Sequence, residues 1–265
     1  MEKKLVVIDG SSLLYRAFYA LPLLTNNEGV YTNAVYGFLR MLLKLYGELD
    51  PAYVAVSFDK GAHTFRNDLY KEYKGTRKAT PQELLSQFSL MKDVLESMGI
   101  AVYEKAGYEG DDILGTLACR YESALPVAVV TGDRDALQLV SGNTTVYLTK
   151  KGISQMAEMT EETVFDTYGV TPEQIVDLKA LMGDASDHIP GVAGVGEKTA
   201  VRLLQQFGSL DEIYRRIVEV SGKRLSEKMR TEKESAYLSQ KLARIRRDIP
   251  LTTQLKEMNC SPRKE

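Results

Sequence analysis

Cysteine and histidine are scarce in this chain, and their scarcity excludes several kinds of chemistry. The 265 residues include two cysteines, Cys119 and Cys260, and two histidines, His63 and His188. That is too few for a disulfide-rich scaffold, and the spacing does not match a zinc site. Neither histidine lies near a nucleophile-elbow sequence, which argues against a Ser-His-Asp hydrolase.

Long apolar runs are also lacking, and neither sign of charge dominates. The run before Asp9 is too short for a signal peptide or a membrane span, so we expect a cytoplasmic protein with no membrane partner. The chain has 34 basic and 36 acidic residues, a net charge of −2, so only the distribution of charge is informative about partners. Hydrophobic residues make up 44% and charged residues 26%, as in ordinary globular proteins.

Four short apolar segments rich in β-branched residues predict buried strands. They are Leu5 to Ile8, Tyr53 to Phe58, Ala101 to Tyr103 and Val127 to Val130, with helical patterns between them. This alternation predicts an α/β fold with a central, mostly parallel sheet flanked by helices. One further strand is expected at Val146 to Thr149, and the chain beyond about residue 150 is expected to be helical.

Three helix starts carry capping signals. Thr80, Thr171 and Ser209 are each followed three residues later by Glu or Gln, and Pro follows the first two directly. We expect these three residues to be N-caps.

Acidic residues follow the predicted strands at their carboxyl ends, the edge where open α/β sheets bind ligands. The third strand is followed by acids in the first turn of a helix, and two more acids share a helical face further along the chain. The nine acids of this pattern are Asp9, Asp59, Glu109, Asp111, Asp112, Asp133, Asp135, Asp184 and Asp187.

Taken singly, most acids at such positions are N-caps or residues favoured by the helix dipole. Nine converging carboxylates would raise one another's pKa values, a cost that divalent cations can remove. Oxygen ligands without His or Cys favour Mg²⁺ or Mn²⁺. Bridging carboxylates can hold two ions about 3.5–4 Å apart, an arrangement suited to phosphoryl transfer.

Basic residues are concentrated in two segments, which favours an anionic substrate. Residues 60–78 hold six Lys or Arg against two acids, with tyrosines and a phenylalanine between them, and residues 202–247 hold twelve against six. Aromatic and basic side chains together suit single-stranded nucleic acid. The alternative for the second segment is an ordinary solvated face.

The glycine-rich segment 191–200 does not match a nucleotide-binding loop. A P-loop needs Lys directly after its last Gly, whereas Glu197 follows Gly196 here. The segment also lacks the third Gly of the dinucleotide-binding fingerprint. A tight turn between two helices, with Lys198 at the start of the second, instead suits a DNA backbone phosphate. The alternative is a simple connector between helices.

Seven segments, in order along nearly the whole chain, resemble the 5′-nuclease (flap endonuclease) family, found at the N-terminus of bacterial DNA polymerase I and as separate proteins. The segments are residues 7–12 (Val-Ile-Asp-Gly-Ser-Ser), 58–59 (Phe-Asp), 73–77 (Tyr-Lys-Gly-Thr-Arg), 108–113 (Tyr-Glu-Gly-Asp-Asp-Ile), 131–135 (Thr-Gly-Asp-Arg-Asp), 183–187 (Gly-Asp-Ala-Ser-Asp) and 191–200.

The resemblance implies a PIN-like α/β nuclease core over residues 1–175 and a helical DNA-binding part over 176–265. A helical arch at about 60–80 would admit a 5′ single strand, and a helix-three-turn-helix at about 183–208 would grip duplex DNA with a potassium ion. Lys74 and Arg77 would reach the scissile phosphate as catalytic residues. The DNA contacts implied are Tyr73, Lys74, Arg77, Gly191, Gly194, Gly196 and Lys198.

The resemblance also implies two Mg²⁺ or Mn²⁺ ions with divided ligands. The first ion would be held mainly by Asp9, Asp59, Glu109, Asp111 and Asp112, and the second mainly by Asp133, Asp135, Asp184 and Asp187. The sequence departs from the family at His188 (usually Asn), Gly110 (commonly Ala) and Ala62 (often basic), which concerns grip on the substrate and not the metal ligands.

We therefore expect a monomeric, metal-dependent 5′-nuclease that acts in DNA replication and repair. It would hydrolyse phosphodiester bonds near 5′ single-strand to duplex junctions and leave a 5′-phosphate. The expected partners are DNA with 5′ flaps, nicks or 5′ ends, RNA primer strands, and a DNA polymerase that is covalently linked or separate. The alternatives are a catalytically idle DNA-junction binding module and a PIN-like metal-dependent ribonuclease.

Overall fold

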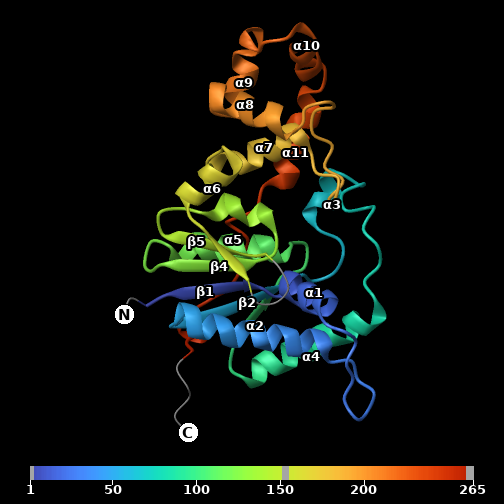
Figure 1. The fold of residues 1–265 in the computed structure, drawn as a ribbon, viewed down its shortest axis with the longest axis vertical. Helices are drawn as coiled ribbons and strands as arrows, with labels where there is room; N and C mark the ends of the chain where they lie inside the picture. Colours follow the sequence, from blue (N-terminus) through green and yellow to red (C-terminus); the bar gives the residue numbers. More distant parts are fainter. Residues whose placement is uncertain (1–2, 151–154, 261–265) are drawn as a thin grey trace. The chain divides into compact units, whose positions relative to one another are not determined.

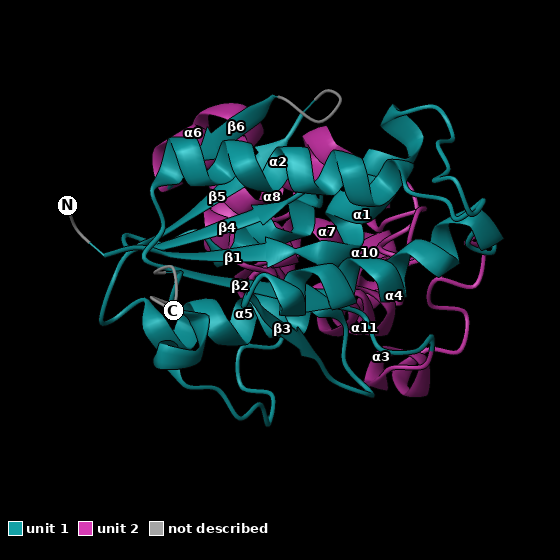
Figure 2. Ribbon diagram, turned by 90° about the horizontal axis from the view of Figure 1, so that it is seen from below, with its two compact units in different colours: residues 1–62, 79–160, 246–265 teal, residues 63–78, 161–245 magenta. Residues whose placement is uncertain are grey.

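The computed structural model describes residues 3–150 and 155–260. They form two compact units, coloured separately in Figure 2. Unit 1 is the described part of residues 1–62, 79–160 and 246–265, and unit 2 is residues 63–78 with 161–245. The segment 63–78, expected within the nuclease core, therefore clusters with the helices of unit 2.

Unit 1 is built around a six-stranded sheet. Its strands are β1 (Leu5–Asp9), β2 (Tyr53–Phe58), β3 (Ala101–Glu104), β4 (Val127–Thr131), β5 (Thr144–Thr149) and β6 (Met156–Met159). Their order is β3-β2-β1-β4-β5-β6, with β1 to β5 parallel and β6 antiparallel to β5. The predicted mostly parallel sheet is confirmed, and its topological switch point lies between β1 and β4, where such sheets bind ligands.

Helices cover both faces of this sheet, as Figure 1 shows. The main helices of unit 1 are α1 (Gly10–Ala20), α2 (Asn33–Leu49), α4 (Gln82–Ser97) and α5 (Gly110–Tyr121), with shorter 3₁₀ helices at Arg134–Leu139 and Leu255–Met258. The first three pack on one face, where Leu14, Phe38 and Phe58 are fully buried, and α5 packs on the other.

The turn from β1 into α1 requires glycine at position 10. A Cβ atom on Gly10 would lie 2.6 Å from Cζ of Phe58 and 2.7 Å from the carbonyl oxygen of Ser57. Because glycine has no side chain, α1 can begin directly after Asp9 and pass close to the end of β2. The close approach fixes Asp9 at the carboxyl edge of the sheet.

One strand was not predicted. The expectation that the chain is helical beyond about residue 150 is wrong for β6, which pairs with β5 through residues 156–159. Its sequence, Met-Ala-Glu-Met, contains no β-branched or aromatic residue, so neither propensity nor alternation marked it as a strand.

Two of the three predicted N-caps are confirmed. Thr171 forms a capping box, and the hydroxyl oxygen of Ser209 accepts a hydrogen bond from the backbone of the first turn that follows. Thr80 is not an N-cap: Pro81 occupies that position, and the Thr80 hydroxyl pairs with the hydroxyl of Tyr15. A tertiary partner has replaced the local one.

Unit 2 is built from helices. They are α3 (Phe65–Leu69), α6 (Glu161–Tyr168), α7 (Ile175–Met182), α8 (Glu197–Phe207), α9 (Leu210–Arg215), α10 (Lys223–Thr231) and α11 (Lys233–Ala243), with 3₁₀ turns at Pro172–Gln174 and Ile217–Glu219. Buried Asp177 on α7 accepts hydrogen bonds from the backbone N–H of Leu210 (2.8 Å) and the side chain of Gln240 (2.6 Å). This carboxylate joins α7 to α9 and α11.

The predicted arch is helical over only a quarter of its length. Helix α3 ends at Leu69, turns follow, and Lys74 has a φ of 56°, which is incompatible with a continuing right-handed helix. Buried Arg66 donates to the carbonyl oxygens of Leu242 and Arg244, both at 2.8 Å. Because these carbonyls lie at the end of α11, Arg66 caps that helix and holds α3 in unit 2.

No helix in the described parts of the chain is long and apolar enough to cross a membrane.

Candidate active site

Asp9 ends β1 and is almost fully buried. One carboxylate oxygen accepts a hydrogen bond from the backbone N–H of Ser12 at 2.9 Å, and the other accepts from the hydroxyl of Thr131 at 2.7 Å. Burial raises the pKa of Asp9 to about 7, against the effect of these hydrogen bonds, and the negative charges of Asp59 and Asp133 add to the rise. The acids of two neighbouring strand ends therefore act on Asp9 electrostatically.

Asp59 directly follows β2 and caps a helix from another part of the chain. Its carboxylate accepts a hydrogen bond from the backbone N–H of Gly110, the first residue of α5, at 2.7 Å. Its own backbone N–H donates to the hydroxyl of Ser11 at 3.1 Å. Asp59 is thus held between the starts of α1 and α5, with a negative charge near the positive end of a helix dipole.

Three acids belong to the start of α5. Glu109 and Asp112 form a capping box, and Asp112 accepts hydrogen bonds from the backbone N–H groups of Glu109 (3.1 Å) and Arg246 (2.8 Å). Both residues are buried, and Asp111 is half-buried in the same turn. Glu109 and Asp112 therefore have the ordinary capping role of acids at a helix start, and their role as metal ligands stays a prediction.

Asp133 and Asp135 follow β4. Asp133 caps the 3₁₀ helix by accepting a hydrogen bond from the backbone N–H of Asp135 at 2.9 Å. Its own N–H donates to the hydroxyl of Thr131 at 3.0 Å, the same hydroxyl that donates to Asp9. Thr131 thus connects the acids of β1 and β4 across the switch point.

These unit 1 acids lie at one edge of the sheet without forming a ready metal cage. Among residues 3–150 and 155–260, no three His, Cys, Asp or Glu side chains are arranged to hold an ion. The donor set nevertheless fits a hard cation, because it consists of oxygens. Burial, with a smaller contribution from the charges of Asp59 and Asp133, raises the pKa of Asp9, and a cation bound beside this carboxylate would favour its ionised form.

Asp184 lies in unit 2, in the turn after α7. Gly183 and Gly191, both with positive φ, cross so closely that a Cβ on Gly191 would lie 2.3 Å from the nitrogen of Gly183. Although burial favours its neutral form, hydrogen bonds from Lys179 (2.6 Å) and Ser186 lower the pKa of Asp184 to about 2. This acid is ionised and compensated within its own unit.

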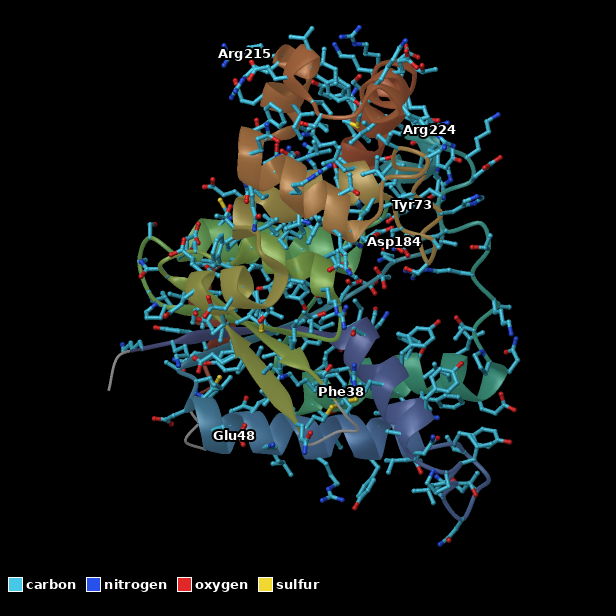
Figure 3. The ribbon with its side chains drawn as sticks, turned by 45° about the horizontal axis from the view of Figure 1, so that its top comes forward. Phe38, Glu48, Tyr73, Asp184, Arg215 and Arg224 are labelled. Carbon is cyan, nitrogen blue, oxygen red and sulfur yellow. The ribbon has the colours of Figure 1, made fainter. Side chains whose placement is uncertain are left out.

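Asp187 is paired with the two predicted catalytic cations, also inside unit 2. It accepts a hydrogen bond from the guanidinium of Arg77 at 2.5 Å, and Nζ of Lys74 lies 3.9 Å from its other oxygen. The backbone N–H of Lys74 donates to the carbonyl of Asp187 at 2.9 Å. Tyr73 and Asp184, labelled in Figure 3, mark the two segments that meet here.

Two predicted DNA contacts, Tyr73 and Gly191, are buried in this structure. The ring of Tyr73 is buried against Val176, Ile189 and Leu242, so it is not exposed to stack on a base. Gly191 is buried, and its backbone N–H and carbonyl are already bonded to the hydroxyls of Ser239 and Ser235 on α11. Both residues hold the turn together.

The remaining predicted DNA contacts of the glycine turn, Gly194, Gly196 and Lys198, are exposed. Gly194 and Gly196 are exposed with open space around each Cβ position, and Lys198 is exposed in the first turn of α8. A turn between α7 and α8, with a lysine at the start of α8, is what the sequence predicts. Its role in DNA binding stays a prediction.

Two family models together match nearly the whole chain. One, described as the N-terminal resolvase-like domain of 5′-3′ exonucleases, matches residues 4–169, and the other, the C-terminal SAM fold of the same enzymes, matches residues 170–265. The chain belongs to the 5′-3′ exonuclease family. It is therefore an enzyme that cleaves phosphodiester bonds, as the resemblance implied.

Curated relatives of this exonuclease include long proteins. DNA polymerase I of Bacillus caldotenax is 53% identical over 97% of the chain, and that of Bacillus subtilis (strain 168) is 51% identical over 94%. The chain spans 30% and 28% of the length of these two relatives. It thus corresponds to one part of each.

Solved structures share the fold of the exonuclease. The T5 D15 protein, co-crystallised with metal ions, matches with a TM-score of 0.75 at 21% identity, covering 91% of this chain and 89% of that one. The catalytic core of Rad2 in complex with DNA matches with a TM-score of 0.61 at 18% identity, covering 93% and 80%. These similarities confirm the fold.

One basic residue of the exonuclease that the sequence motifs do not indicate lies close to Gly132, the residue before Asp133. Arg16 on α1 lines a cavity of about 540 Å³ together with Ser12, Tyr15, Tyr19 and Gly132. Its Nη1 donates to the carbonyl of Lys150 at 3.2 Å, while its buried Nε has no hydrogen-bond partner among the described residues. Burial lowers the pKa of Arg16. The only feature of the sequence that could have indicated Arg16 is its charge, seven positions after Asp9 and between Tyr15 and Ala17.

Proposed function

We propose that the chain is a Mg²⁺-dependent 5′-nuclease that cuts DNA near junctions between a 5′ single strand and a duplex and leaves a 5′-phosphate. The observation that carries this proposal is the placement of Asp9, Asp59 and Asp133 after three neighbouring strands at the carboxyl edge of the sheet, where burial, with mutual repulsion, raises the pKa of Asp9. Such a site is unfavourable unless it takes up positive charge.

The acids of unit 1 would hold the cations. Asp9, Asp59 and Asp133 present oxygen ligands, which favour Mg²⁺ or Mn²⁺ over softer metals. A divalent cation bound there supplies a water of lowered pKa and stabilises charge on the leaving oxygen. The assignment of Asp184 and Asp187 to a second ion, and of a potassium ion to the glycine turn, rests on the family resemblance.

The basic side chains would bind and orient the substrate. Arg16 can hydrogen-bond a phosphate that enters the cavity beside Gly132, because its guanidinium group belongs to the lining of that cavity. Lys74 and Arg77 can stabilise charge on the scissile phosphate when they release Asp187 and bind the phosphate in its place. Lys198 and the exposed N–H groups near Gly196 can hold a duplex phosphate.

The known relatives support a DNA substrate. One neighbour is described as the T5 D15 flap endonuclease in a product-like complex with DNA and metal ions, and the Rad2 core is bound to DNA substrate. We propose that this chain acts on 5′ flaps, nicks, 5′ ends and RNA primer strands as a monomer in the cytoplasm, during replication and repair. A linked or separate DNA polymerase would be its partner.

Cleavage of labelled DNA tests this proposal. The substrates are a 5′-flap duplex, a matched flap of RNA and a blunt duplex, each with and without Mg²⁺. We expect Mg²⁺-dependent cutting of the DNA flap at the junction and a 5′-phosphate on the product. Binding without cleavage would favour the idle binding module, and preferential cutting of the RNA strand would favour the PIN-like ribonuclease.

A further inference from the structure

Two lysines of unit 1 share one carboxylate beside Asp59. Nζ of Lys60 lies 2.7 Å from one oxygen of Glu104, and Nζ of Lys92 lies 2.6 Å from the other. Lys60 directly follows Asp59, Glu104 ends β3, and Lys92 comes from α4. These three residues are here called the cluster, and Lys60 and Lys92 are its lysine pair. The cluster carries a net charge of +1.

The cluster is fixed in place by the core beneath it. Glu104 lies opposite Phe58 in the register of β2 and β3, and the ammonium of Lys92 lies 5.6 Å from the centre of the Phe58 ring. That ring is fully buried and occupies the space next to Gly10. The lysine pair is therefore held at a defined position relative to the strand ends that carry Asp9 and Asp59.

The cluster keeps binding capacity for a second anion. Each ammonium has three N–H donors, and Glu104 engages one of them from each lysine. The Lys60 side chain is 53% exposed, whereas those of Lys92 and Glu104 are 29% and 26% exposed. Lys60 thus presents donors to solvent while the other two residues hold it in position.

We propose that Lys60 and Lys92 bind the DNA phosphate adjoining the one that is cut, and that Glu104 is the positioning residue that keeps the two ammonium groups together. The proposal rests on the proposed function, which brings the scissile phosphate to the acids at the same sheet edge. Lys60 directly follows Asp59 in the sequence, so the anion expected near the lysine pair is the next phosphate of the same DNA strand. Two ammonium groups held by one carboxylate can donate to the oxygens of that phosphate.

Neutral phosphate analogues test the contact. Flap DNAs carrying one uncharged methylphosphonate, at each of three positions around the cleavage site, are bound to the wild type and to Lys60→Ala in EDTA, which prevents cleavage. With the methylphosphonate at one adjoining position, we expect the wild type to bind about fivefold more weakly than it binds unmodified DNA. We expect Lys60→Ala to bind the two DNAs equally. Lys44→Ala, which removes a comparable exposed pair with Glu48 on α2, should keep the full penalty.

The salt dependence gives a second measure. The loss caused by Lys60→Ala should shrink about threefold between 50 and 200 mM salt, because one phosphate contact has been removed. A methylphosphonate penalty that persists in Lys60→Ala at every position would overturn the proposal. If instead the wild type fails to cleave any flap DNA with Mg²⁺, the proposed function fails, whatever the outcome at Lys60.

Glu104→Gln separates a phosphate site from a purely structural ion pair by the sign of its effect. The amide oxygen of Gln can still accept a hydrogen bond from a lysine ammonium and so keep part of the positioning, while loss of the carboxylate raises the local charge by one. We therefore expect tighter DNA binding and a salt dependence steeper by roughly one contact. A role confined to joining α4, β2 and β3 predicts a lower melting temperature with unchanged affinity. Unchanged or weaker DNA binding by Glu104→Gln would contradict the proposal.

Discussion

The acids of the two units differ in how their charge is compensated. In unit 1, Asp9 accepts hydrogen bonds from a hydroxyl and a backbone N–H, and burial, with a smaller contribution from the neighbouring acids, raises its pKa to about 7. In unit 2, Asp184 is paired with Lys179 and its pKa falls to about 2, while Asp187 is paired with Arg77 and Lys74. Acidic motifs of the same family can therefore hold a carboxylate with a raised pKa in unit 1 and carboxylates paired with basic side chains in unit 2. The acids of unit 1 are the stronger candidates for binding a cation.

The largest expected effect comes from removing the charge of Asp9. Asp9→Asn should lower the rate of flap cleavage by about 10³-fold or more, because a carboxylate that holds the cation is lost. Single-turnover kinetics measure this effect, and Asp93→Asn, an exposed change on α4, is the control. Cleavage by Asp9→Asn within tenfold of the wild type would contradict the assignment.

The same substitution should stabilise the metal-free protein. The folded-state pKa of Asp9 is raised above its unfolded value, so the wild-type free energy of unfolding should fall as pH rises from about 4 to about 7. Asn does not titrate, and Asp9→Asn should therefore be more stable at pH 8 by at least about 1 kcal/mol. Denaturant unfolding in EDTA at pH 4.5 and 8 checks the sign.

Next in size is the effect of the cations paired with Asp187. Arg77→Ala and Lys74→Ala should each lower the single-turnover rate by about 10²–10³-fold if these side chains stabilise charge on the scissile phosphate. Arg215→Ala, which breaks an exposed pair with Glu212 on α9, is the control. If Arg77→Ala weakens binding and leaves the rate of the bound complex unchanged, the segment only guides the substrate.

A somewhat smaller loss is expected at the cavity of unit 1. Arg16→Ala should lower cleavage by roughly 10–10²-fold, because the phosphate loses a charged donor in a partly buried site. Arg16→Lys should restore little, since an ammonium does not reproduce the planar guanidinium. Arg40→Ala, on the exposed side of α2, provides the comparison, and equal activity of Arg16→Ala and Arg40→Ala would refute a role for the cavity.

The smallest effect is expected at the glycine turn of unit 2. Lys198→Ala should weaken duplex binding severalfold and make the salt dependence shallower by about one phosphate contact, with little change in the bound-state rate. Binding titrations at several salt concentrations measure this, with Lys241→Ala on α11 as control. An unaltered salt slope would mean that the turn is only a connector.

The sequence predicted the parts of the site that depend on local pattern. Strand periodicity located β1, β2 and β4 to within one residue at their carboxyl ends, so the positions of Asp9, Asp59 and Asp133 at one sheet edge followed directly. The turn between α7 and α8 followed from its glycines in the same way.

The features that were missed depend on contacts between distant segments. Arg77 and Asp187 are 110 residues apart, and nothing in the local sequence of either residue indicates the other. Tyr73 was expected in an exposed aromatic and basic segment, but long-range packing against α7 and α11 buries its ring. The shared Glu104 of Lys60 and Lys92 likewise required the register of β2 and β3.

A divalent cation is expected to complete the site that the unit 1 acids form, and a Mg²⁺ titration of thermal stability measures whether it does. A ligand bound only by the folded state adds RT ln(1 + [L]/Kd), about 2.7 kcal/mol at a hundredfold excess over Kd. We expect Mg²⁺ to raise the melting temperature of the wild type, and we expect Asp9→Asn, although more stable without metal, to lose most of this rise. An equal rise in both proteins, or none in the wild type across a wide Mg²⁺ range, would contradict this expectation.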